Sequence, residues 1–335
     1  KIGIHDNFFE LGGHSLLAVR LVNKLNEVFK RECKIDVVFK YPTVSEIIDY
    51  MKSGNEMNLS SGVIKITQNV KESNKRMFCV PGAGGHITSF YQLSSLLEES
   101  HILYGFQAYG LDKEDEAINT IEALAAQNIK DMQEIDSQGP YCLVGYSLGA
   151  TVAYEMSLQL IEKGYEISEL IIIDGLHSYS SDQASSQTNS YLEHLISVFN
   201  VICNYYDKVI QSDIIEEALI GKSKKEQIDL IYNELTMLGI GFLTKKSFKL
   251  FVSVYIGQIE MSLEYKSKII EGYNIPIYLF KSRSLNDKDV PLEKNGEDFG
   301  WGLVTEGKVI IEEVDGTHLT MLNLPFVKEI AKKIV

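Results

Sequence analysis

From Val63 to the end of the chain, short apolar runs alternate with longer segments of helical periodicity. The runs lie at 63–67, 76–80, 102–107, 141–146, 170–174, 275–280 and 309–314. Short apolar runs are typical of buried strands, and their alternation with helices is typical of a mostly parallel sheet covered by helices. The pattern therefore predicts an α/β fold for this part of the chain.

The alternation stops between residues 177 and 272. This segment has no convincing strand, but helical patterns occur at 191–206, 214–237 and 247–265. Helices that interrupt a series of strands without replacing them form an extra layer or subdomain. We therefore expect a helical insertion within the α/β domain.

The N-terminal residues have a different pattern of apolar and polar positions from the rest of the chain. An apolar stripe runs from Leu16 to Phe29, and a second short helical segment covers residues 44–51. Residues 54–62 are small and polar, as in a flexible linker. The sequence therefore predicts a small all-α domain at 1–53, followed by the α/β domain at 63–335.

Composition narrows the classes of partner. The 335 residues include 32 Lys and Arg against 46 Asp and Glu, a net charge of −14. This balance argues against a protein that grips phosphate backbones, so no nucleic acid is expected. No apolar run approaches the ~20 residues that span a bilayer, and the first residues do not resemble a signal peptide. We expect a cytoplasmic protein with no membrane partner.

The four cysteines give no sign of a metal or disulfide site. They are scattered, without CxxC spacing or histidines at ligand intervals: Cys33, Cys79, Cys142 and Cys203. This distribution predicts reduced thiols and no bound metal.

The strongest chemical signal is Gly-Tyr-Ser-Leu-Gly at 145–149, between an apolar run and a helical segment. On a tight strand-to-helix turn a serine hydroxyl is forced into the open, and a Cβ on either of the motif's two glycines would collide with the neighbouring strand and helix. The alternative is a glycine-rich turn that happens to contain a serine. The context favours Ser147 as a nucleophile.

A nucleophilic serine needs a general base, and in folds with this turn the order along the chain is serine, acid, histidine. The histidines downstream are His177, His194 and His318. His194 lies within a helical stretch, as expected of a helix-surface or lid residue. His318 follows the last apolar run, in a loop from which an imidazole reaches the carboxyl ends of the strands. We expect His318 to be the base.

The acid has two candidate positions. Asp174 ends the apolar run LIIID and so emerges at the carboxyl edge of the strand after the nucleophile strand. Asp287 and Asp289 lie in the loop after the run IPIYLF, where many α/β-hydrolases place this residue. Spacing alone favours Asp174 without excluding the other two.

The negative oxygen formed when a serine attacks a carbonyl needs two backbone N–H donors. Leu148 supplies one by its position after the serine. The loop Pro-Gly-Ala-Gly-Gly at 81–85 is glycine-rich enough to bring a second, for which we expect Ala83. The alternative for this loop is a sharp turn; it is not a dinucleotide-binding fingerprint, because GxGxxG is absent.

A second serine lies in the N-terminal domain, within the sequence DNFFELGGHSLLA at residues 6–18. Ser15 stands at the start of the amphipathic helix, where free N–H groups and the helix dipole favour an anion. It is either a simple helix cap or the attachment site of a phosphate-bearing group.

The motif DNFFELGGHSLLA resembles the core motif of the peptidyl carrier proteins of nonribosomal peptide synthetases. The resemblance implies that Ser15 carries a covalent 4′-phosphopantetheine arm. The segment VFKYPTVSEIIDYM is similar to the closing helix of that family, so the likeness covers residues 1–53. The family's first helix normally precedes the DNFFELGG loop; we expect a helical-bundle carrier domain that lacks it, at the end of a larger synthetase.

Residues 63–335 resemble the type I thioesterases that terminate such synthetases, an α/β-hydrolase fold with a helical lid. The segments VPGAGG, GYSLG, LIIIDG and GTHLTML occur in the family's order. The family places its acid after the strand that follows the nucleophile strand, which implies Asp174. The helical insertion corresponds to the family's lid.

Together these resemblances imply a module that releases a peptide. A peptidyl thioester passes to Ser147, and the resulting ester is released by hydrolysis or macrocyclisation. The implied partners are upstream condensation and adenylation domains, a phosphopantetheinyl transferase and the peptidyl substrate. Two alternatives stay open: a free-standing esterase or lipase in which Ser15 is a helix cap, and a non-catalytic docking module.

Overall fold

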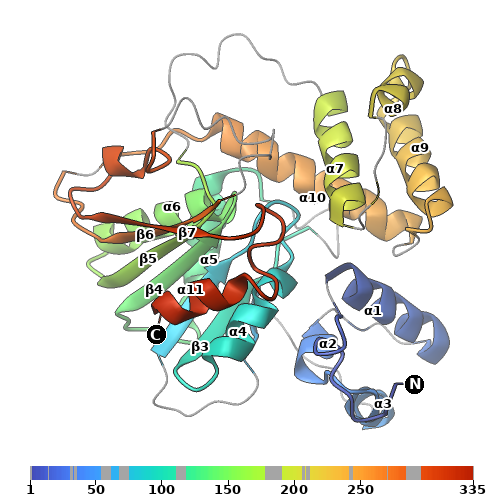
Figure 1. The fold of residues 1–335 in the computed structure, drawn as a ribbon, viewed down its shortest axis with the longest axis horizontal. Helices are drawn as coiled ribbons and strands as arrows, with labels where there is room; N and C mark the ends of the chain where they lie inside the picture. Colours follow the sequence, from blue (N-terminus) through green and yellow to red (C-terminus); the bar gives the residue numbers. More distant parts are fainter. Residues whose placement is uncertain are drawn as a thin grey trace.

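The computed structural model (Figure 1) describes most of the chain. The described residues are 2–13, 15–30, 33, 36–53, 62–67, 75–110, 118–177, 191–205, 208, 212–240, 244–269, 271–283 and 296–334. The predicted linker at 54–62 lies outside them except for Gly62. Asp287 and Asp289 also lie outside the described residues.

A single sheet forms the centre of the α/β domain. In the described part of the chain it has seven strands in the order β1-β3-β2-β4-β5-β6-β7. Strand β1 pairs with β3 in antiparallel fashion, and every other pair is parallel. The strands are β1 (Val63–Lys65), β2 (Lys75–Val80), β3 (His101–Phe106), β4 (Tyr141–Tyr146), β5 (Ile167–Ile173), β6 (Ile277–Ser282) and β7 (Val309–Val314).

Helices cover both faces of the sheet, as the alternating pattern predicts (Figure 1). Helices α4 (Tyr91–Leu97) and α11 (Val327–Ile334) share one buried core with the sheet. Helices α5 (Ile121–Gln133) and α6 (Gly149–Glu162) share a second core on the opposite face. Because the strands are buried on both sides, they consist of nearly continuous apolar runs instead of alternating ones.

The expected helical insertion follows β5 and precedes β6. It contains α7 (Tyr191–Tyr205), α8 (Ser212–Leu219), α9 (Lys224–Met237) and α10 (Lys245–Glu264). The stretch predicted as one helix at 214–237 is two helices, because Gly221 adopts a φ of 76° and Ser223 caps α9 with a capping box. The four helices bury a core of their own, separate from the two cores of the sheet.

The described residues before the linker form turns and helices and contain no strand. Helix α1 (Ser15–Phe29) and α3 (Val44–Ser53) agree with the predicted segments, and a further short helix, α2 (Asp36–Lys40), lies between them. Helix α1 lies against η1 (Ile87–Phe90), the 3-10 turn that leads into α4. The N-terminal domain is therefore in contact with the α/β domain (Figure 1).

The four cysteines are free and buried. Among the described helices, none combines the length and the apolar character that crossing a bilayer requires.

Candidate active site

Ser147 lies on the tight turn between β4 and α6. Its backbone has a φ of 55°, in the left-handed region that residues other than glycine seldom adopt. A Cβ on Gly145 would lie 2.5 Å from the Cα of Ala150, and one on Gly149 would lie 2.2 Å from the carbonyl oxygen of Val80. The two glycines are therefore needed for this turn, and the turn holds the Ser147 side chain clear of the sheet.

His318 lies in the loop between β7 and α11 and contacts both other members of the predicted triad. Its Nε2 is 3.0 Å from the Oγ of Ser147, and its Nδ1 is 2.8 Å from the Oδ2 of Asp174. A carboxylate beside Nδ1 favours the tautomer with a proton there, which leaves Nε2 free to accept from the serine hydroxyl. The structure thus brings together three residues that are 27 and 144 positions apart.

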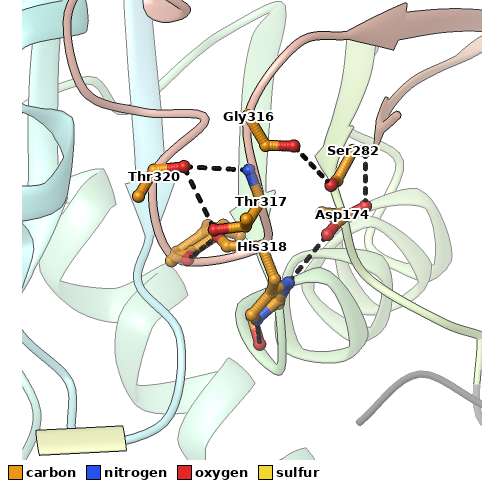
Figure 2. A network of polar contacts seen from close by, with 8 residues as sticks. Asp174, Ser282, Gly316, Thr317, His318 and Thr320 are labelled. Atoms are coloured by element: carbon orange, nitrogen blue, oxygen red, sulfur yellow. Dashed lines mark hydrogen bonds and ion pairs between the residues drawn. The ribbon is translucent and has the colours of Figure 1, made fainter. Parts of the chain in front are cut away.

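Asp174 follows β5 directly, and Figure 2 shows it hydrogen-bonded to Ser282 on one side and His318 on the other. Its own N–H donates to the carbonyl of Phe280 at 2.8 Å, and its Oδ1 accepts from the N–H of Ser282 at 2.9 Å. Its side chain is 4% exposed. The indole N–H of Trp301 donates to the carbonyl of the next residue, Gly175, at 2.8 Å. These bonds aim the carboxylate at His318 and keep water away from it.

Two residues that the sequence analysis did not single out position the histidine loop. Ser282 donates its hydroxyl to the carbonyl of Gly316 at 2.9 Å, so the residue that binds Asp174 also binds the loop of His318 (Figure 2). Tyr146 donates its hydroxyl to the carbonyl of His318 at 2.6 Å, and its ring stacks on the imidazole with centroids 5.3 Å apart. An aromatic face against an imidazole stabilises the positive charge that the ring gains as a base.

The loop at 81–85 passes beside Ser147, as an oxyanion loop must. A Cβ on Gly82 would lie 3.1 Å from the Cβ of Ser147. The N–H of Gly84 donates to the Oε1 of Gln258 at 2.8 Å, and Gln258 is a buried residue of α10 in the insertion. Ala83 packs against the core of the insertion. The bond from Gly84 to Gln258 thus ties the loop that contains Ala83 to a helix of the insertion. Ala83 and Leu148 remain the predicted oxyanion donors.

The other histidines near the site have no contact with Ser147 or Asp174 among the described interactions. His177 is buried between Tyr154 and Trp301, and its Nε2 is 3.0 Å from the Oγ of Ser267. Burial lowers the pKa of His177 to about 4, and it also lowers the pKa of His86 to about 4. His194 is buried on α7. His177 and His86 are therefore neutral at pH 7.

Ser15 is the first residue of α1, as predicted. The preceding loop is tightly folded, because Gly12 has a φ of 88° and a Cβ on Gly13 would lie 2.4 Å from the carbonyl oxygen of Phe8. The first N–H groups of a helix have no partner within it, and the first turn of α1 has no acidic residue. The local chemistry fits a phosphodiester-linked group on Ser15.

Two family models match the chain. Residues 1–51 match the phosphopantetheine attachment site, and residues 75–227 match the thioesterase domain. The chain thus matches a phosphopantetheine attachment domain followed by a thioesterase domain. The match at 75–227 includes Ser147 and Asp174, whereas His318 lies beyond it. The cofactor of the carrier domain is 4′-phosphopantetheine.

The relatives are nonribosomal peptide synthetases. A dimodular nonribosomal peptide synthase of Bacillus subtilis (strain 168) is 35% identical over 52% of this chain and 7% of its own length. The crystal structure of a four-domain nonribosomal peptide synthetase, holo and bound to AMP and glycine, covers 100% of this chain and 24% of its own, with a TM-score of 0.71 and 27% identity. This chain thus spans a small part of these relatives.

A solved thioesterase domain has a similar fold over most of this chain. The Vlm2 thioesterase domain with a bound dodecadepsipeptide covers 82% of this chain and 96% of its own, with a TM-score of 0.59 and 18% identity. The resemblance inferred from DNFFELGGHSLLA and GYSLG to a carrier–thioesterase pair is confirmed by these matches.

Proposed function

We propose that this chain is the release module of a nonribosomal peptide synthetase, with a carrier domain at 1–53, a linker at 54–62 and a thioesterase at 63–335. One observation carries the proposal: the hydrogen-bonded series Ser147–His318–Asp174 lies in the same chain as a phosphopantetheine attachment domain. Upstream condensation and adenylation domains supply the peptide, and a phosphopantetheinyl transferase modifies Ser15. All of these steps take place in the cytoplasm.

The arm on Ser15 supplies a thiol that holds the peptide as a thioester. Ser147 attacks the thioester carbonyl through its Oγ, and the Nε2 of His318 takes the hydroxyl proton. Asp174 holds the Nδ1–H and stabilises the imidazolium that forms. When the carbon–sulfur bond breaks, His318 returns the proton to the departing sulfur, and the peptide is left as an ester on Ser147.

The negative oxygen of the tetrahedral intermediate is bound by backbone N–H groups of Leu148 and Ala83. Both segments are fixed before the substrate arrives: Leu148 by the turn of Ser147, and the loop of Ala83 by the bond from Gly84 to Gln258. Donors that are fixed in advance need no reorganisation during the reaction, which is why each is worth ~10²–10³ in rate.

The ester on Ser147 is released by water or by a nucleophile of the peptide itself, giving a linear acid or a macrocycle. The insertion acts here as a lid. Two aromatic rings of α10 border the oxyanion loop: a Cβ on Gly84 would lie 2.7 Å from the ring of Phe251 and 3.5 Å from that of Tyr255. Exclusion of water from this surface favours the internal nucleophile.

Two variants of the full chain test this division of labour. Each is loaded with an acyl group from acyl coenzyme A by a phosphopantetheinyl transferase, and release is compared with hydrolysis of a small free thioester. Ser15→Ala is expected to abolish loading while free thioester hydrolysis continues. Ser147→Ala is expected to load normally and to lose both reactions. Loading of Ser15→Ala, or hydrolysis by Ser147→Ala at the original rate, would contradict the proposal, and the free-standing esterase predicts no loading of either chain.

A further inference from the structure

The loop that leads to Ser15 lies against the thioesterase. The ring of Phe9 stacks on the ring of Tyr91, with centroids 3.9 Å apart and an interplanar angle of 23°. The hydroxyl of Tyr91 donates to the Oδ1 of Asn7 at 3.3 Å. Phe9 is 4% exposed and Tyr91 is 9% exposed, so water is excluded from the contact. This is a packed contact with a polar bond at its edge, the composition of an anchor point in a protein interface.

On the carrier side, the loop is rigidly connected to the rest of its domain. The Oδ1 of Asn7 also accepts from the N–H of Phe9 at 2.9 Å, and the N–H of Phe8 donates to the carbonyl of Pro42 at 2.8 Å. The ring of Phe9 lies 5.0 Å from that of Phe39 in α2. A contact with the ring of Phe9 therefore restrains the carrier domain as a whole, including the start of α1.

On the thioesterase side, the contact lies beside the catalytic loops. Tyr91 is the first residue of α4, and only η1 and His86 separate it from the oxyanion loop at 81–85. The next residue, Gln92, accepts a hydrogen bond from the N–H of Leu324, in the loop that follows His318. The residue before it, Phe90, packs edge-on against Tyr146, which binds His318. The carrier thus meets the thioesterase where the loops of the triad are supported.

We propose that Tyr91 anchors a docking surface for the carrier domain of the same chain, and that the acyl group is passed to Ser147 from this docked arrangement. The proposal rests on the proposed function and names the surface that the carrier uses. The proposal follows from the continuity of the chain. The loop that contacts Tyr91 leads directly to Ser15, and the oxyanion loop at 81–85 lies just before Tyr91 in the sequence. A tethered carrier needs only a weak interface, because the linker supplies a high effective concentration.

The test uses the full chain, loaded on Ser15 with an acyl group from acyl coenzyme A. Single-turnover release from the carrier is measured beside hydrolysis of a small free thioester, and the ratio of the two rates is compared among variants. For Tyr91→Ala, which removes the ring, the ratio is expected to fall about tenfold or more, as for truncation of an interface anchor. For Tyr91→Phe, which keeps the ring stack and removes only the bond to Asn7, we expect a fall of about threefold.

The outcomes distinguish a failure of the proposed function from a failure of the docking surface. If the wild-type chain fails to release the acyl group through Ser147, the proposed function is wrong. If it releases the acyl group and the ratio is unchanged in Tyr91→Ala, only the docking surface is wrong. Should Tyr91→Ala lose free thioester hydrolysis through misfolding, Tyr91→Phe decides alone, because loss of one oxygen preserves the packing. An unchanged ratio in Tyr91→Phe would then overturn the proposal.

Discussion

The triad loops and the helical insertion are built in different ways. Each triad residue lies on a loop at the carboxyl end of a parallel strand and is tied to its neighbours by several hydrogen bonds. The insertion has its own core, and it meets the site through side chains of α10, where Gln258 binds Gly84 and Phe251 stacks on His86 at 5.4 Å. The comparison indicates that the predicted triad and the helical insertion are supported separately and meet at the loop at 81–85.

The largest expected effect comes from breaking the triad itself. Asp174→Asn keeps the size of the side chain, and Asn tolerates the positive φ of 47° at this position. The amide no longer fixes the histidine tautomer, so kcat for a small thioester is expected to fall about 10³–10⁴-fold. Asp131→Asn is the matched control, a buried carboxylate that binds Tyr109 and Gln127 away from the site. Equal losses in the two variants would show that Asp174 acts only through stability.

Breaking the hydrogen bond between Gly84 and Gln258, which connects the loop at 81–85 to the insertion, should have a smaller effect. Gln258→Met removes the acceptor of the Gly84 N–H and leaves the oxyanion loop free to shift, so kcat/KM is expected to fall about tenfold. Gln227→Met makes the same change within the insertion, where the amide donates to the carbonyl of Leu219 at 3.1 Å. It should lower the free energy of unfolding by about 1 kcal/mol and leave kcat/KM near its original value. Unchanged kinetics in Gln258→Met would mean that the loop holds its own shape.

A change within the triad loops that keeps every catalytic group should have a smaller effect again. Tyr146→Phe retains the ring against His318 and removes the hydroxyl bond to its carbonyl. We expect kcat to fall about fivefold, because one neutral hydrogen bond contributes about 1 kcal/mol. Tyr154→Phe removes a comparable bond, from α6 to the carbonyl of Lys268 at 3.0 Å, in which no residue of the triad takes part. A fall in kcat with Tyr154→Phe and none with Tyr146→Phe would contradict the positioning role.

The two buried histidines should have the smallest effect at neutral pH. Their effect is on the free energy of unfolding, and it grows as the pH is lowered. His177 and His86 have pKa values of about 4 in the folded chain against 6.5 for a free imidazole. Between these values the unfolded chain binds more protons than the folded chain, so the free energy of unfolding falls as the pH is lowered from 6.5 toward 4. For His177 the slope is about 1.4 kcal/mol per pH unit. Urea unfolding of His177→Gln should show a shallower pH dependence than the wild type; an identical slope would refute the buried neutral state.

The sequence predicted the positions of those functional residues that directly follow a strand. The positions of Ser147, Asp174 and His318 follow from apolar runs and the residues just after them, because parallel strands bring their carboxyl ends to one edge. The structure places these three side chains within hydrogen-bonding distance. Spacing left Asp287 and Asp289 open, since a carboxylate after either strand reaches the same edge.

The supporting residues could not be predicted in the same way. Gln258 binds a residue 174 positions away, and Ser282 binds one 108 positions away. Neither lies in a motif, and their partners are decided by how the insertion packs and by how β6 pairs with β5. Only Tyr146 had a local signal, because a residue beside the nucleophile on the same turn necessarily lies near the histidine. Contacts between elements that are distant in sequence depend on packing, which periodicity does not encode.

The central claim is that the acyl group moves from Ser15 to Ser147, and mass spectrometry tests it most directly. The full chain is loaded with an acyl group from acyl coenzyme A, quenched at successive times, and mapped by fragmentation. The account predicts that the acyl mass appears first on the peptide containing Ser15, next on the peptide containing Ser147, and then in solution. In Ser147→Ala it should persist on Ser15. Loading at a residue other than Ser15, or release from Ser147→Ala at the wild-type rate, would contradict the account.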